Sequence, residues 1–249
     1  MKWSDVARIE AYKVDAHTTD DVCLALCTTD LAHIVDEETP GWTELVHAII
    51  ERFPVRADWL SVVAQPPFAT NRSILWDRAA ASAMQRAAPA GELWRQARAD
   101  FQADGALRDI YISNTAVDDW NTTIALARGT CGDVTLSSGS GEPILHDLGE
   151  RHFAGESRAL VTIRVDGVAM IGHCFSAAEI ELSFDPADVD GIERFAALVR
   201  FLAALAAVLQ RTVRITPENL PDGPIIDIAP DGEARAIPAA APRVISSER

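Results

Sequence analysis

Three consecutive strand-like stretches open the chain, at residues 6–14, 21–27 and 31–35, and hydrophobic and polar residues alternate in the first of them. Alternation with a period of two is typical of strands that bury one face. Thr and Asp residues, which favour turns, lie between the stretches. Because the connections are short, we expect the three strands to form an antiparallel meander.

Two helices are predicted after the meander. From Trp42 onward the bulky apolar side chains recur with the period of a helix, Thr39 is a candidate N-cap, and Pro54 ends the pattern. Residues 57–64 repeat this period over a shorter length. Residues 71–76 are a candidate extended segment.

The second half is predicted to open with a buried strand at residues 110–112. A helix follows, and Thr115 with Asp118 has a spacing suited to cap its N-terminus. Gly129 is expected to end this helix, because glycine is common just after a helical C-terminus. Residues 134–136 then form the next predicted strand.

A tight hairpin is predicted at Asp166-Gly167, which lies between alternating runs at residues 160–165 and 168–175. An Asp-Gly pair in this setting favours a type I′ turn, because both central residues must adopt positive φ. Residues 180–184 are expected to add another antiparallel strand.

The longest helix is predicted at residues 191–210, where apolar residues form a broad face. Asp190 and Glu193 have the spacing of a capping box at its start. Residues 213–216 and 224–228 are expected to be the last strands.

These patterns divide the chain into an N-terminal meander with helices (residues 1–78), a connector (79–106), a C-terminal α+β domain (107–228) and a Pro/Ala-rich tail (229–249). The connector is rich in Ala, Arg and Gln, so we expect it to be partly helical. The tail is expected to be extended or loosely held. The predicted fold class is therefore α+β, with two antiparallel-sheet-plus-helix units joined by an Ala-rich connector.

Charge narrows the possible partners. The 249 residues carry a formal net charge of −15, from 37 Asp and Glu against 22 Lys and Arg. Such a surface repels phosphate groups, which argues against nucleic acid and anionic membranes and leaves a basic protein, cations and small neutral molecules open as partners. The oligomeric state is left open.

The chain is also expected to be soluble and cytoplasmic. Its first residues contain no apolar signal segment. The most apolar run, residues 195–209, is interrupted by Arg200 and is too short to span a bilayer.

The four cysteines are expected to be free thiols. Cys23 and Cys27 lie four residues apart in a predicted strand, where the rise per residue separates them by about 13 Å. That distance is too long for a disulfide. Cys131 and Cys174 each stand alone in the sequence.

The histidines offer no convincing site for chemistry. His17 lies near three aspartates and could join them in binding a divalent cation, but a hairpin turn explains this cluster better. His146 and His152, six residues apart, point about 240° away from each other on a helix. His173 and Cys174 are neighbours in a predicted strand and therefore point to opposite faces.

Two short motifs also fail on spacing. The Ser-Ser-Gly-Ser-Gly run at residues 137–141 lacks the glycine pattern of a nucleophile elbow or a phosphate-binding loop. Residues 185–191 are acidic like a calcium loop, but Pro186 stands where the first acidic ligand belongs. We therefore assign no catalytic, cofactor-binding or metal-binding residue and no cofactor.

Three functional hypotheses follow. The favoured one is a non-enzymatic protein-binding module, inhibitor- or immunity-like, whose acidic surface binds a basic partner. The alternative is a hydrolase-type enzyme whose site is assembled in a cleft between the halves, with His17, His173 and the Asp118/Asp119 pair as contributors. The third is a scaffold or homo-oligomer subunit, which predicts an exposed apolar patch.

Overall fold

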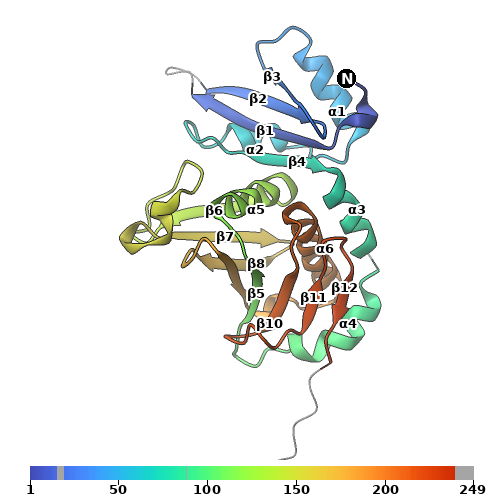
Figure 1. The fold of residues 1–249 in the computed structure, drawn as a ribbon, viewed down its shortest axis with the longest axis vertical. Coiled ribbons are helices and arrows are strands. Elements are labelled where there is room, and N and C mark those ends of the chain that lie inside the picture. The colour runs from blue at the N-terminus through green and yellow to red at the C-terminus, as the bar shows by residue number, and fades with distance from the viewer. Residues whose placement is uncertain (16–19, 88, 239–249) are drawn as a thin grey trace, which may run out of the picture.

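The chain folds into helices packed on two antiparallel sheets, which confirms the predicted α+β class (Figure 1). The structure is a computed structural model that describes residues 1–15, 20–87 and 89–238. Within these residues, the smaller sheet has the strand order β3-β2-β1-β4 and the larger one β12-β11-β10-β5-β9-β8-β7-β6. The division into two units joined at residues 79–106 stays a prediction.

The smaller sheet contains the predicted meander and one further strand. Its strands are β1 (Arg8–Asp15), β2 (Asp20–Cys27), β3 (Ala32–Asp36) and β4 (Ser73–Asp77). The candidate extended segment at residues 71–76 thus contributes β4, which pairs with β1 on the side opposite β2. Apolar residues of this sheet, among them Ile9, Leu24 and Leu26, form a buried cluster with Ile49 and Trp59 of the two predicted helices.

Those helices are α1 (Trp42–Arg52) and α2 (Trp59–Ala64). The predicted cap by Thr39 is wrong, because the N-cap of α1 is Gly41 and no side chain caps it. The Thr39 hydroxyl instead donates to the Asp36 carboxylate at 2.7 Å and closes the turn between β3 and α1.

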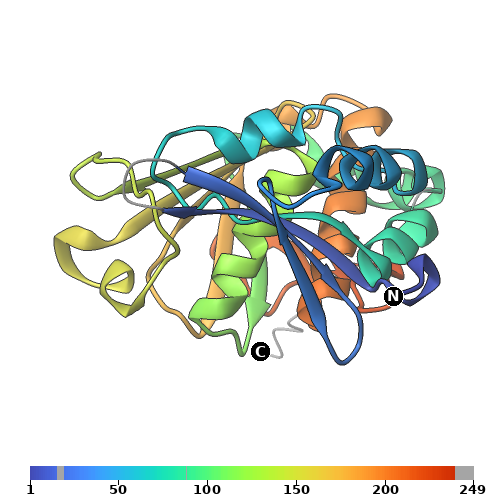
Figure 2. The same cartoon turned by 90° about the horizontal axis from the view of Figure 1, so that it is seen from above.

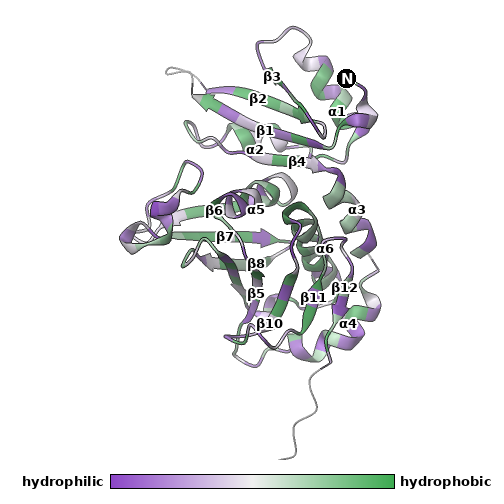
Figure 3. Ribbon diagram, in the orientation of Figure 1, coloured by the Kyte–Doolittle hydropathy of each residue, from purple (hydrophilic) through white to green (hydrophobic). Residues whose placement is uncertain are grey.

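The larger sheet carries the main core. Its strands are β5 (Arg108–Ser113), β6 (Asp133–Ser138), β7 (Ala159–Val165), β8 (Val168–His173), β9 (Glu179–Phe184), β10 (Val213–Pro217), β11 (Ile226–Ile228) and β12 (Ala234–Ala236). Helices α5 (Val117–Thr130) and α6 (Ile192–Leu209) contact each other and pack on this sheet. In Figure 3 the hydrophobic colour gathers on α6 and the strands beside it, because most of that helix is buried.

The predicted hairpin joins β7 to β8. Asp166 and Gly167 have φ values of 49° and 90°, and Val165 pairs with Val168 across the turn. These are the positive angles that a type I′ turn requires, so the prediction is confirmed.

The predicted caps of α5 and α6 are both displaced. The N-cap of α5 is Ala116, whose N–H donates to Asp119, while the Thr115 hydroxyl donates to the Ala177 carbonyl. At α6 no side chain caps the helix, and Asp190 pairs with Arg194 at 3.3 Å instead. A tertiary partner thus engages Thr115, whereas Asp190 pairs locally with a residue of α6 itself.

Gly129 does not end α5, which continues to Thr130. Its role is close packing, because a Cβ atom at this position would lie 1.8 Å from the carbonyl oxygen of Ile74 in β4. Ile74 belongs to the larger buried cluster and Leu75 to the smaller one. Strand β4 therefore contributes to both cores, and the smaller sheet lies above α5 in Figure 1 and in front of it in Figure 2.

The connector is partly helical, as predicted. It contains α3 (Arg78–Ala87), α4 (Gly91–Ala97) and a 3₁₀ turn, η2 (Arg98–Phe101). It packs on α6, where the rings of Trp94 and Phe101 lie 4.9 and 5.2 Å from that of Phe195.

The expected tail includes an ordered strand. Residues Ala234–Ala236 form β12 and pair with β11, so the larger sheet extends into the segment expected to be extended or loosely held. The remainder of that segment, residues 239–249, lies outside the described residues. No helix in the part of the chain that the structure describes is long and apolar enough to cross a membrane.

Candidate functional site

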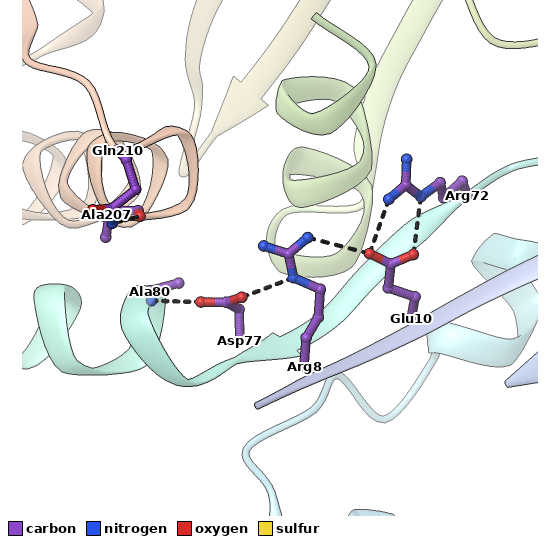
Figure 4. A network of polar contacts seen from close by, with 7 residues as sticks. All are labelled: Arg8, Glu10, Arg72, Asp77, Ala80, Ala207 and Gln210. Atoms are coloured by element: carbon purple, nitrogen blue, oxygen red, sulfur yellow. Dashed lines mark hydrogen bonds and ion pairs between the residues drawn. The ribbon is translucent and has the colours of Figure 1, made fainter. Parts of the chain in front are cut away.

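A chain of four charged residues lies where the smaller sheet meets α3 (Figure 4). Arg72 donates two hydrogen bonds of 3.0 Å to the buried carboxylate of Glu10. Arg8 donates to Glu10 at 3.4 Å and to Asp77 at 2.8 Å. Asp77 in turn accepts the backbone N–H of Ala80 at the start of α3.

The two arginines and two carboxylates of this polar chain neutralise one another. We therefore interpret the polar chain as a structural contact between the smaller sheet and α3. The hydrogen bonds that Arg72 donates to Glu10 raise the pKa of Arg72, as expected for a fork-like pair with a carboxylate. A catalytic acid or base needs a proton that it can give or take near neutral pH, and paired Arg and carboxylate groups do not provide one.

The outer edge of β3 is a different kind of surface. Every residue of β3 except Val35 is exposed, and Ile34 has 62% of its surface accessible. Leu31, just before the strand, is 65% exposed. Strand β2 is the only partner of β3 among the described residues, so the other edge of β3 is unpaired. An unpaired edge offers a row of backbone donors and acceptors to another chain.

Among the described histidines, His146 and His152 line the same cavity, whereas His173 is not one of its lining residues. His173 is exposed and stacks on Phe175 with ring centroids 5.6 Å apart. His152 is buried, accepts the N–H of Gly149 on Nδ1 at 2.8 Å, and has its pKa lowered by burial and by the nearby charge of Arg151. His17 lies outside the described residues.

The Asp118/Asp119 pair is likewise engaged separately from His173. Asp119 caps α5 and pairs with Arg211 at 3.3 Å, while Asp118 is exposed. Among the described residues, Asp119 and His173 therefore have separate contacts.

The two motifs rejected on spacing have structural roles. At residues 137–141 the hydroxyls of Ser138 and Ser140 lie 2.7 Å apart, and Gly141 N–H donates to the Ser138 carbonyl to close a turn. Asp185 caps a short 3₁₀ turn by accepting the Ala187 N–H at 2.8 Å. Within the residues that the structure describes, no group of three or more His, Cys, Asp or Glu side chains is arranged to hold a metal ion.

All four cysteines are free thiols, as predicted. Cys174 is fully buried, and this burial raises its pKa to about 12. A thiol with so high a pKa carries almost no thiolate at neutral pH and is a poor nucleophile.

Comparisons with known proteins identify no relative. No family model, no curated protein and no solved structure matches the chain. Function must therefore be argued from the surface and cavities of this chain.

Two features of the structure, the acidic surroundings of the edge strand β3 and the cavity at Arg128, were not predicted from the sequence. The lack of Lys and Arg between Lys13 and Arg52 is visible in the sequence, but its significance depends on β3 being an edge strand. The position of Arg128 in a cavity depends on how α5, β6 and two loops come together, which no local pattern reveals.

Proposed function

We propose that this chain is a protein-binding module that takes up an extended basic segment of its partner on the outer edge of β3. The observation that carries this proposal is the unpaired, exposed edge of β3 among the described residues. Adding a strand to such an edge is a common mode of peptide recognition, in which backbone hydrogen bonds supply much of the affinity.

The hydrogen-bond pattern defines which groups are available. Thr28 N–H donates to the Leu31 carbonyl and Glu37 N–H donates to the Val22 carbonyl, at the two ends of the β2–β3 ladder. Because bonding alternates along an antiparallel pair, the backbone groups of Ala32, Ile34 and Asp36 point away from β2. These groups face the incoming strand.

Charge selects a basic partner. Residues 20–51 contain no Lys or Arg. They contain eight acidic residues: Asp20, Asp21, Asp30, Asp36, Glu37, Glu38, Glu44 and Glu51. Five of these eight are exposed and lie in or beside β3 or at the start of α1: Asp30, Asp36, Glu37, Glu38 and Glu44. Lysines and arginines on the added strand would meet these carboxylates, and the apolar side chains of Leu31 and Ile34 would pack against its other residues.

The same charge disfavours pairing between two copies through this edge. Two β3 strands brought side by side would place their acidic neighbours against each other, and like charges across strands are destabilising. Acidic residues at an edge are also a known protection against self-association. This favours a basic partner over the homo-oligomer hypothesis.

The experiment measures binding of a fluorescent ten-residue peptide of alternating Lys and Val by anisotropy at low salt. Ala32→Pro removes one outward N–H at the first residue of the strand, a position where proline is tolerated. We expect this variant to bind at least tenfold more weakly than the wild type.

Ile34→Lys is expected to weaken binding as well, because it adds a positive charge and removes an apolar contact. The matched control is Ile171→Lys, which makes the same change at a 42% exposed isoleucine of β8 in the other sheet. Circular dichroism confirms that each variant is folded. The proposal is overturned if the wild type does not bind, or if Ala32→Pro binds as tightly as the wild type, since the attraction would then be general charge alone.

A further inference from the structure

A cavity of about 200 Å³ lies between the segment that leads into β4, the last turn of α5, and β6. Much of its wall is apolar, with Val62, Val134, Leu136 and Ile144 among the lining residues. Backbone bonds fix these walls: Thr70 N–H donates to the Leu145 carbonyl, and Ile144 N–H donates to the Leu136 carbonyl.

One arginine, Arg128 of α5, lines this cavity. Among the described residues, no hydrogen bond, ion pair or aromatic ring engages its guanidinium. Burial lowers the pKa of Arg128, and only the more distant charge of Asp147 acts against that effect.

Arg128 is partly buried, and the fold treats the more deeply buried Arg108 very differently. Arg108 is 5% exposed and donates hydrogen bonds to the Asp104 carboxylate and to the carbonyls of Asp100, Ala106 and Leu107. Arg128 is only partly buried, but a guanidinium that loses hydration without gaining such partners is still disfavoured. Arg128 therefore lacks the contacts that would explain it as part of the scaffold.

We propose that this cavity binds a small organic monocarboxylate, with its carboxylate on Arg128 and its hydrocarbon part against the apolar walls. Guanidinium and carboxylate match in geometry and form paired, charge-assisted hydrogen bonds. Largely apolar walls with a single charged anchor are typical of a site that orients a small, mainly hydrocarbon ligand.

The composition of the wall favours a carboxylate over a phosphate. Arg128 is the only Lys or Arg among the residues that line this cavity, so a single negative charge is balanced and a second one is not. Phosphate also requires hydrogen-bond donors around all its oxygens. Here the amide of Asn71 is already used, because it donates to the Val63 and Gln65 carbonyls.

The test uses sodium hexanoate as the probe, with hexanamide as its neutral isostere and inorganic phosphate as the competing anion, all at constant ionic strength. We expect hexanoate to raise the melting temperature of the full chain and to give a saturable heat of binding in calorimetry. Hexanamide and phosphate are expected to do neither.

The decisive variant is Arg128→Met, which keeps an unbranched side chain and removes the charge. We expect it to bind hexanoate at least tenfold more weakly, as for the loss of a charge-assisted pair. Without ligand, its melting temperature should equal or exceed that of the wild type, because a partly desolvated charge without a protein partner has been removed.

The matched control is Arg56→Met. Arg56 is also close to Gly132, but it donates hydrogen bonds of 2.9 and 2.6 Å to Asp58. This variant should keep hexanoate binding and should not gain stability. The inference is overturned if hexanoate does not bind, if hexanamide or phosphate binds equally well, or if Arg128→Met retains the affinity of the wild type.

Discussion

The closest contact between α5 and β4 predicts the effect of replacing Gly129 with alanine. The added Cβ would lie 1.8 Å from the carbonyl oxygen of Ile74 and 2.4 Å from its carbonyl carbon. Real Cβ atoms essentially never come closer than 3.0 Å to another heavy atom, so helix and strand must separate by roughly 1.2 Å. Backbone atoms form the obstacle, and rotation of a side chain cannot relieve it.

The expected destabilisation follows from two opposing contributions. Overpacking in a rigid core costs about 1–3 kcal/mol, and a backbone clash belongs at the upper end. Replacing glycine by alanine inside a helix contributes about 1 kcal/mol in the opposite direction. Gly129→Ala should therefore lower the free energy of unfolding by about 2 kcal/mol, which corresponds to a fall in melting temperature of about 4–8 °C for a chain of this size.

The assay is chemical denaturation followed by circular dichroism, with Gly91→Ala as the matched control. Gly91 is the first residue of α4, and a Cβ there would meet only the Ile192 side chain at an ordinary 3.8 Å. The same substitution should leave stability unchanged or raise it by up to about 1 kcal/mol. If Gly129→Ala is as stable as the wild type, β4 does not approach α5 as closely as described.

Three further predictions concern buried polar groups. Lys13→Met should lower the free energy of unfolding by about 3 kcal/mol, because the nearly buried Lys13 ammonium binds one carboxylate and two carbonyl oxygens. The control Lys2→Met, at an exposed position, should leave the free energy of unfolding unchanged. Since the folded pKa of His152 is below its unfolded value, its contribution to stability is present above pH ~6.5 and declines as the pH falls below that value. Stability titrations should show this decline, and His152→Asn, which still offers an acceptor to Gly149, should weaken it. Cys174 should resist thiol reagents in the native protein at pH 8 and react only after denaturation, as mass spectrometry can show.

Strands and helices of this chain follow largely from local patterns, whereas caps do not. The Asp166-Gly167 hairpin was predictable because both turn residues require backbone angles that few other residues adopt. The cap by Thr115 failed because its hydroxyl is claimed by Ala177, more than sixty residues away. The prediction that Gly129 ends α5 was wrong for a similar reason, because the missing side chain of Gly129 allows β4 to approach the helix closely.

The candidate sites depend even more on distant parts of the chain. The acidic composition of the first half is plain in the sequence, but the orientation of the Ala32 and Ile34 backbone groups requires the pairing of β2 with β3. Arg128 has no distinguishing local pattern, and only the assembled cavity shows that its charge has no partner among the residues that the structure describes.

The sharing of β4 between the two buried clusters has a consequence for dissecting this protein. A cut after Asp77 would leave Ile74 of one fragment and the Gly129 side of α5 in the other exposed to water. Fragments covering residues 1–77 and 78–249 should therefore aggregate and be poorly soluble when each is alone, yet reassociate when they are mixed. Complementation of this kind would make the contact between β4 and α5 a means of joining or separating the two fragments experimentally.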